Sequence, residues 1–102
     1  LVTFAELCEA PLAARDYLAV AGKYAGIVMR GVPSFDDQNE ASARRFMWLV
    51  DALYDRSRFL IVSAATDIGS LYEGHHFAFE FSRTMSRLSE MTCRGKLFQT
   101  DI

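Results

Sequence analysis

Two arginines in the segment FSRTMSRLSEM are the residues of this chain whose type and spacing best suit chemistry. Arg83 and Arg87 stand four positions apart, so a helix would place them on one face. Two guanidinium groups on one face can hold a phosphate or a carboxylate through paired hydrogen bonds. The alternative is a solvated face on which Glu90, three residues after Arg87, offsets one charge. Spacing alone favours this alternative.

One acidic pair and one histidine pair are weaker candidates, and the site that they could form is a metal site. Asp51 and Asp55 are also four apart and could ligate Mg²⁺, and His75 is followed directly by His76. Metal sites usually draw ligands from several elements at defined spacing, and Asp55 can instead pair with Arg58. We therefore expect no metal site here and surface positions for these side chains.

Sequence signatures of nucleotide binding and of known catalytic triads do not occur in the chain. There is no G-x-x-x-x-G-K-[ST], the loop whose backbone N–H groups and lysine hold nucleotide phosphates. The two cysteines, Cys8 and Cys93, are far apart and lack C-x-x-C spacing, which predicts reduced, mostly buried thiols. We expect this chain to bind no nucleotide, Mg²⁺ or other cofactor by itself.

Composition sets the class of protein. The 102 residues are 51% hydrophobic and 24% charged, as in an ordinary globular protein of one domain. The net charge of −2 disfavours non-specific nucleic-acid binding. No apolar run approaches the roughly 18 residues that span a bilayer, so we expect at most peripheral membrane contact. Because the chain begins at a leucine, we expect it to be a piece of a longer protein.

The elements that must position the arginines follow from hydrophobic periodicity. Residues Glu40–Asp55 (EASARRFMWLVDALYD) form an amphipathic helix between two apolar strands, Gly26–Arg30 and Phe59–Ala65. Strand, helix and strand make a right-handed βαβ unit, which requires parallel pairing. We therefore predict an α/β fold, a βαβ unit with parallel strands and flanking helices.

Several further expectations concern packing. Both strands are continuous apolar runs, which predicts that helices cover both faces of the sheet. Two strands do not make a stable sheet alone, so either further strands lie outside the chain or helices cap both edges of the sheet, and we favour the first. The side chains expected to face the sheet from the long helix are those of Phe46, Val50 and Leu53.

Further helices are predicted around this unit, including a short one at Asp67–Tyr72. Thr3 is the expected N-cap of a short helical turn at Phe4–Glu9. Pro11 suits the first turn of a second helix that runs to about Ala21. The last helix begins at Phe79 or Phe81. The apolar stripes expected on the second and last helices are Leu12, Ala14, Leu18 and Ala21, and Phe81, Met85, Leu88 and Met91.

Four separated blocks, in this order and spacing, resemble one known family. They are FAELCEAPLAARDYLAVA, GVP, ARRFMWLVDALYD followed by VSAA, and FEFSRTMSRLSEM. Together they resemble the C-terminal part of the ZapE-like family of AAA-type P-loop ATPases, over roughly Phe4 to Met91. The chain departs from the usual family pattern at Ala13, where a glycine is common, and after Met91.

The resemblance implies that residues 1–102 are a single C-terminal segment of an ATPase whose Walker A and B regions lie upstream. It implies ATP and Mg²⁺ as cofactors of the intact protein and a possible homo-oligomer. The segment FEFSRTMSRL is more similar to the bacterial members of the family. In these members the resemblance implies action in cell division on a tubulin-like division protein in the cytoplasm. In mitochondrial members it implies quality control of inner-membrane respiratory proteins.

Two functions therefore stand side by side. In the first, the segment couples ATP binding and hydrolysis to its client, and Arg83 or Arg87 acts as an arginine finger toward a nucleotide phosphate or a neighbouring subunit. Such an arginine stabilises the charge that develops on the transferred phosphoryl group. In the second, the segment is a non-catalytic protein-interaction module with no nucleotide role.

Overall fold

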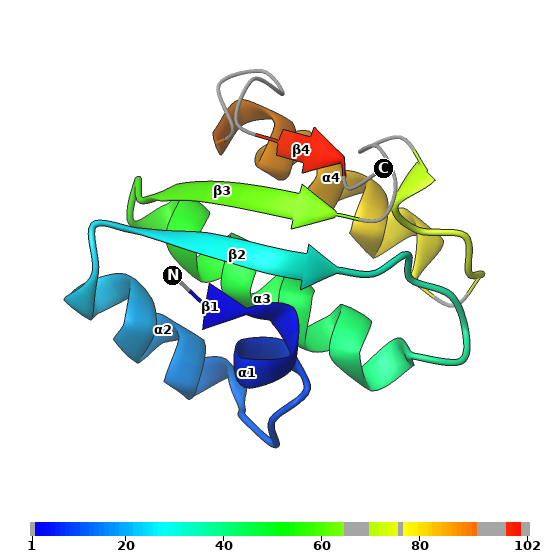
Figure 1. Ribbon diagram of the computed structural model, residues 1–102, viewed down its shortest axis with the longest axis horizontal. Coiled ribbons are helices and arrows are strands. Elements are labelled where there is room, and N and C mark those ends of the chain that lie inside the picture. Colours follow the sequence, from blue (N-terminus) through cyan, green and yellow to red (C-terminus); the bar gives the residue numbers. More distant parts are fainter. Residues whose placement is uncertain (1, 65–69, 76, 92–97, 101–102) are drawn as a thin grey trace.

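The computed structural model describes residues 2–64, 70–75, 77–91 and 98–100. Within this part of the chain, the strands form a single sheet and the helices pack behind it (Figure 1). The elements in chain order are β1 (Val2–Thr3), α1 (Phe4–Cys8), α2 (Ala14–Lys23), β2 (Gly26–Val32), α3 (Glu40–Asp55), β3 (Phe59–Ala64), α4 (Ala78–Met91) and β4 (Phe98–Thr100). None of the described helices is long and apolar enough to cross a membrane.

All four strands of the sheet are parallel and follow the order β1-β2-β3-β4. The predicted parallel pairing of β2 with β3 is confirmed, with Gly26 opposite Phe59 and Met29 opposite Val62. Two strands that the sequence did not predict, β1 and β4, extend the sheet on either side of this pair, and the expectation of further strands outside the chain stays a prediction. These strands have two and three residues, too few to show an apolar run.

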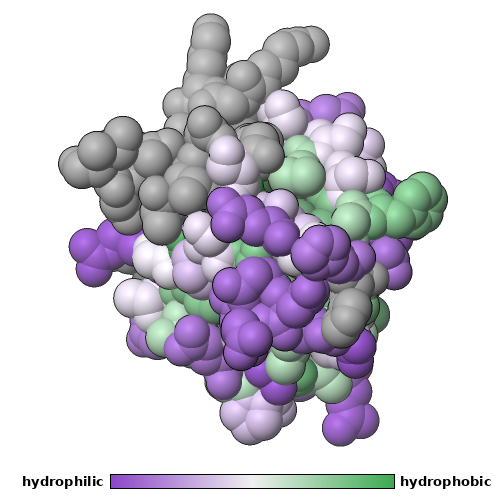
Figure 2. All heavy atoms as spheres, turned by 90° about the vertical axis from the view of Figure 1, so that its right-hand side faces the viewer, coloured by the Kyte–Doolittle hydropathy of each residue, from purple (hydrophilic) through white to green (hydrophobic). Residues whose placement is uncertain are grey.

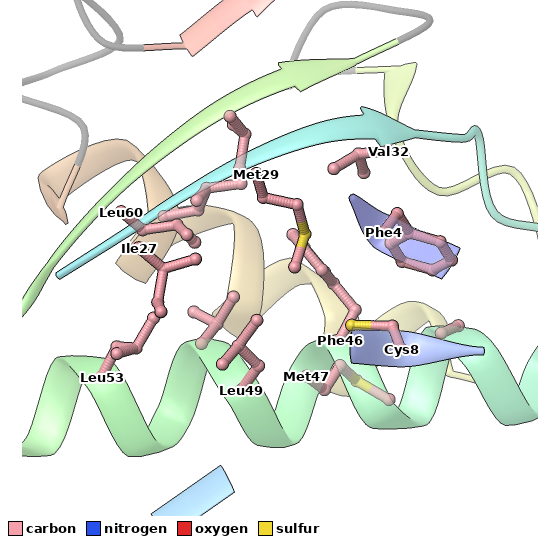
Figure 3. Close-up of a cluster of buried hydrophobic side chains, with 14 of the residues drawn as sticks. Phe4, Cys8, Ile27, Met29, Val32, Phe46, Met47, Leu49, Leu53 and Leu60 are labelled. Carbon is pink, nitrogen blue, oxygen red and sulfur yellow. The ribbon is translucent and has the colours of Figure 1, made fainter. Parts of the chain in front are cut away.

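The long helix has the predicted bounds, Glu40–Asp55. In Figure 1, α3 lies behind the sheet and connects β2 to β3 by the predicted right-handed crossover. Phe46, Val50 and Leu53 have no exposed surface, as predicted. Figure 3 shows the side chains of α3 directed toward those of the strands, with Leu53 below Ile27 and Leu60.

The face of the sheet opposite α3 is less covered than the sequence predicts. In β2 and β3 burial alternates: Met29 and Val62 are buried, Val28 and Ile61 are half-buried, and Phe59 is 44% exposed. A sheet in consecutive order with right-handed crossovers receives its connecting helices on one face only. Among the described helices none crosses the other face (Figure 1), so the expected cover on both faces is wrong for this part of the protein.

Thr3 caps α1 as predicted. Its side-chain oxygen accepts a hydrogen bond from the Glu6 N–H at 3.2 Å, and the Glu6 carboxylate accepts one from the Thr3 N–H at 2.9 Å. This reciprocal pair satisfies donors that a helix leaves free at its start. The hydrogen bond from the Thr3 backbone, the larger cause, lowers the pKa of Glu6.

The second helix begins at Ala14 instead of near Pro11. The Asp16 carboxylate accepts a hydrogen bond from the Ala13 N–H at 2.7 Å, which sets the start of the helix. The predicted stripe is wrong in part, because Leu18 is 51% exposed and Ala14 is exposed. The buried residues are Ala21 and Tyr17.

Aromatic rings hold α4 against α3. Phe35, Phe46 and Phe81 lie with ring centres 5.3 to 6.3 Å apart, and Phe4 joins them from α1. Of the predicted α4 stripe, Phe81 and Leu88 are buried, whereas the two methionines are half-buried. The helix begins at Ala78, slightly before either predicted start. This core fixes the helix that carries the two candidate arginines.

Candidate functional site

Arg87 is held by residues of the neighbouring helix. Its guanidinium forms an ion pair with Asp51 of α3, and its Cζ lies 4.9 Å from the centre of the Tyr54 ring. The predicted pairing of Arg87 with Glu90 is wrong, since Glu90 instead accepts a hydrogen bond from the Tyr54 hydroxyl at 3.0 Å. With its side chain only 26% exposed, Arg87 acts as a clamp between α3 and α4.

The hydrogen bond to Glu90 raises the pKa of Tyr54. The negative charge of Glu90 acts in the same direction, whereas the positive charge of Arg87 opposes it. Tyr54 therefore stays neutral and keeps donating to Glu90 near neutral pH. The group Asp51, Tyr54, Arg87 and Glu90 is thus an internally paired network at the α3–α4 contact.

Arg83 has a different environment one helical turn earlier. Its side chain is exposed, and it forms no hydrogen bond or ion pair with any described residue. It lines a shallow hollow of about 350 Å³ between α3 and α4. The wall opposite includes Arg44 and Trp48 of α3. Arg83 is therefore accessible to a group that approaches from outside.

Arg44 places a second exposed cation on the same hollow. Its guanidinium carbon lies 5.2 Å from the centre of the Phe77 ring, a cation–π contact. Asp51 also lines the hollow but is paired with Arg87, and Glu80 is the other acidic residue of the lining. Two guanidinium groups beside aromatic surface can bind an oxyanion or a carboxylate.

Sequence reasoning found Arg83 but did not connect it with Arg44. The two residues are 39 positions apart, and the packing of α4 on α3 brings them to one hollow. The sequence did indicate that both arginines lie outside the buried stripes of their helices. That signal identifies an exposed arginine, but it does not identify the residue across the helix contact.

The other predicted side chains have ordinary partners. Arg58 donates a hydrogen bond from Nε to the backbone oxygen of Ala21 at 2.8 Å, so the structure shows a different partner from the predicted Asp55. The His75 N–H donates to Asp37 at 2.9 Å, and His75 Nδ1 lies 3.2 Å from the same carboxylate. His76 lies outside the described residues.

The His75–Asp37 contact joins the loop before α3 to the segment before α4. Figure 2 shows the side of the molecule toward which β2 and β3 run, where hydrophilic residues gather at the centre. In the same region Phe35 and Tyr72 form a parallel β-bridge. Across the described residues, no group of three or more His, Cys, Asp or Glu side chains is arranged to hold a metal ion.

Cys8 is buried, as predicted, and burial raises the pKa of its thiol to about 12. A thiol that stays protonated is a poor nucleophile and a poor metal ligand. Cys8 is therefore a core residue of α1. Cys93 lies outside the described residues.

Comparison with known proteins gives consistent relatives. The profile of the AFG1-like ATPase family matches residues 1–99. The cell division protein ZapE of Escherichia coli strain K12 is 38% identical over 90 residues, which are 88% of this chain and 24% of the relative. Lactation elevated protein 1 homolog B of Danio rerio is 33% identical over 89 residues, which are 87% of this chain and 18% of the relative.

A protein of Schizosaccharomyces pombe, uncharacterized protein C115.02c, is 29% identical over 117 aligned residues. No solved structure matches the chain. The chain spans about a quarter or less of the length of these relatives. Because the family profile covers almost every residue, the chain belongs to the AFG1-like ATPase family.

Proposed function

We propose that this chain is the C-terminal region of an ATPase that binds ATP with Mg²⁺ and uses hydrolysis in cell division. The family match and the 38% identity to a protein named for cell division support this proposal. The chain has no phosphate-binding loop of its own. Its contribution is therefore to act on nucleotide, subunit or client from outside the nucleotide pocket.

Arg83 is the residue that we assign to this contribution. The observation that carries the assignment is the contrast between an exposed Arg83, which pairs with none of the described residues, and an Arg87 engaged by Asp51 and Tyr54. An arginine that meets the phosphate of a neighbouring subunit must be free to leave its own surface. Arg83 satisfies this requirement, whereas Arg87 would first have to abandon its partners. Arg44 supplies a second positive charge beside it.

The test compares ATP turnover of the intact protein with that of its Arg83→Ala variant. We expect turnover to fall by at least tenfold, since an arginine supplied in trans contributes on the order of 10³-fold or more where it occurs. Arg15→Ala is the matched control, because Arg15 is also an exposed helix arginine. Unchanged turnover in a folded, normally assembled Arg83→Ala protein would show that Arg83 is surface charge only.

Mixing separates contact with a neighbour from contact within one subunit. Arg83→Ala protein is mixed with a variant that cannot bind ATP but keeps Arg83. If Arg83 acts on a neighbour, mixed assemblies recover turnover, because the second variant supplies the arginine. If turnover does not recover while mixed assemblies form, the arginine acts inside its own subunit.

A second candidate function, a protein-interaction surface, has an observation of its own. Phe59 is 44% exposed beside the half-buried Val28 and Ile61, on the sheet face that no described helix covers. Exposed aromatic surface of this kind suits protein contact. The partner proposed for a bacterial protein is the tubulin-like division protein in the cytoplasm. Phe59→Ser in the intact protein should then weaken that binding while ATP turnover stays unchanged.

A further inference from the structure

A second, smaller hollow lies between the start of α2 and the start of α3, and we call it the α2–α3 hollow. Its volume is about 160 Å³, and it is lined by Leu12, Ala13, Ala41, Arg44, Arg45 and Trp48. Arg44 and Trp48 also line the hollow between α3 and α4 that contains Arg83. Figure 1 shows α3 between α2 and α4, so the two hollows lie on either side of α3.

The α2–α3 hollow is positively charged. Among the described residues, its lining has two arginines and no acidic side chain, whereas Asp51 and Glu80 contribute to the lining of the α3–α4 hollow. Arg44 is exposed and Arg45 is half-buried, and neither forms an ion pair with a described residue. The chain as a whole carries a net charge of −2, so this positive surface is a local feature. Its electrostatic complement is a negatively charged group.

The basic and aromatic side chains of this hollow are held in place by the fold. The cation–π contact of Arg44 fixes its guanidinium. Nη1 of Arg45 lies 3.5 Å from the backbone oxygen of Cys8, which leaves the guanidinium further N–H donors. The Trp48 ring packs against the ring of Tyr17, with their centres 6.5 Å apart. Side chains that are already ordered lose little conformational entropy on binding, and tryptophan and arginine dominate the energetics of protein contacts.

The size of the α2–α3 hollow indicates what kind of ligand it takes. It is smaller than the roughly 300–1,000 Å³ of small-molecule pockets, so it has room for a single side chain. The half-buried Leu12 and Trp48 give it apolar walls. A nucleic acid is disfavoured, because the net negative charge of the chain opposes a polyanion. A few carboxylates close to the two arginines are attracted by the local charge, since salt screens the more distant charges.

We propose that a short acidic peptide segment of a partner protein docks in the α2–α3 hollow. One apolar side chain of the segment lies against Leu12 and Trp48, and carboxylates beside it pair with Arg44 and Arg45. None of these contacts requires Arg83, so the segment can stay bound while Arg83 acts elsewhere. The proposal therefore goes beyond the proposed function and does not depend on it.

Fluorescence anisotropy of a labelled peptide mixed with the intact protein tests the proposal. The probe is fluorescein-labelled Glu-Asp-Leu-Phe-Glu-Asp, and the reference peptide has serine in place of leucine and phenylalanine. We expect saturable binding of the probe and binding about tenfold weaker for the reference peptide, because the reference has no apolar side chain to fill the hollow. The affinity for the probe should also fall as the salt concentration rises.

Charge reversal at one arginine locates the binding. Arg44→Glu should weaken binding of the probe about tenfold, because it replaces an attraction by a repulsion. Arg30→Glu is the matched control and should change the affinity by less than about twofold. Arg30 is also exposed, but it follows the buried Met29 in β2 and therefore lies on the opposite face of the sheet.

A peptide of opposite charge separates docking from a loss of folding. The peptide Lys-Arg-Leu-Phe-Lys-Arg should bind the Arg44→Glu protein about fivefold more tightly than it binds the unaltered protein. The Arg30→Glu protein should show no such gain. A protein that merely misfolds loses affinity for the acidic probe but does not gain affinity for the basic one at this position only.

Several outcomes would overturn the proposal. They are no saturable binding of the acidic probe, equal losses in Arg44→Glu and Arg30→Glu, or a loss in Phe59→Ser alone. A single-stranded oligothymidine that displaces the probe and is itself released by Arg44→Glu would overturn it in favour of a nucleic acid. Arg83→Ala should keep the affinity for the probe within about twofold, whatever its effect on ATP turnover. Peptide docking and the proposed function can therefore fail separately.

Discussion

The ion pair between Arg87 and Asp51 joins α4 to α3 and separates the roles of two arginines on one helix face. Arg87 contacts Asp51 and the ring of Tyr54, whereas Arg83, one turn away, points into an open hollow. Equal spacing in sequence thus gives unequal accessibility, because the neighbouring helix supplies a carboxylate and a ring at one of the two positions. The difference between the two arginines can be measured, because Arg87 should affect the free energy of unfolding and Arg83 should affect the ATP turnover of the intact protein.

Arg87→Ala should lower the stability of the fold. The substitution removes the pair with Asp51 and the cation–π contact with Tyr54, both partly exposed to solvent, which together are worth about 1–2 kcal/mol. Urea unfolding followed by the fluorescence of Trp48, the single tryptophan of this chain, measures the change in the free energy of unfolding. Arg83→Ala is the control and should change that free energy by less than about 0.5 kcal/mol. Equal effects of the two substitutions would contradict the assignment of Arg87 as the clamp.

Gly26 should not tolerate a side chain while Phe59 is present. A Cβ at Gly26 would lie 2.4 Å from the Phe59 ring, which covers the glycine on the uncovered sheet face. We expect Gly26→Ala to cost about 1–3 kcal/mol, as overpacking does. Phe59→Ala made together with Gly26→Ala removes the obstructing ring. In a double-mutant cycle the combined loss should therefore be smaller than the sum of the two single losses; simple additivity would show that the ring moves aside freely.

The parts of the fold that could be predicted from sequence are those with strong local signals. Phe46, Val50 and Leu53 recur at the spacing of one helix face, so the buried face of α3 follows from it. Thr3 and Glu6 have the spacing of a capping box, so the start of α1 follows as well. These signals lie within one element and need no knowledge of its neighbours.

The parts that could not be predicted depend on contacts between elements. Tyr17 looks like a surface residue of α2, but its ring packs against Trp48 and its hydroxyl donates to the Leu7 oxygen at 2.9 Å. β1 is recognisable as a strand only because Val2 and Thr3 lie beside β2. The same reason explains the site. Sequence spacing selected both arginines, and the positions of Asp51 and Tyr54 distinguish Arg87 from Arg83.

Stability should fall at alkaline pH because of two buried groups. Burial raises the pKa of the Cys8 thiol from 9.0 to about 12, and burial is also the largest cause that raises the pKa of Tyr17 from 10.0 to about 12. Each group therefore contributes stability that is fully present below its unfolded pKa. That stability is lost as pH rises toward 12, since the unfolded chain releases the proton first.

The expected slope is at most about 1.4 kcal/mol per pH unit for each group within its window. Urea unfolding between pH 8 and 11 measures it. Tyr17→Phe should remove the part that begins near pH 10 and leave the part that begins near pH 9. Because the substitution also removes the hydrogen bond to Leu7, the comparison concerns the slope with pH and not the absolute stability. An unchanged slope in Tyr17→Phe would show that Tyr17 ionises as readily in the folded chain as in the unfolded one.

The chain of residues 1–102 alone should release no phosphate from ATP with Mg²⁺ above a buffer blank. Arg83 and Arg44 can stabilise charge on a phosphate that another part of the protein presents, but they cannot replace a loop of backbone N–H groups and a lysine that hold the nucleotide. The measurement compares phosphate release by equal concentrations of the chain and of the intact protein, with chain folding checked by Trp48 fluorescence. Adding the chain to an intact Arg83→Ala protein extends the test, because an arginine that acts on a neighbour should restore part of the lost turnover if the chain docks. Phosphate release that stays with the folded chain alone through purification would contradict the proposal that another part of the protein holds the nucleotide.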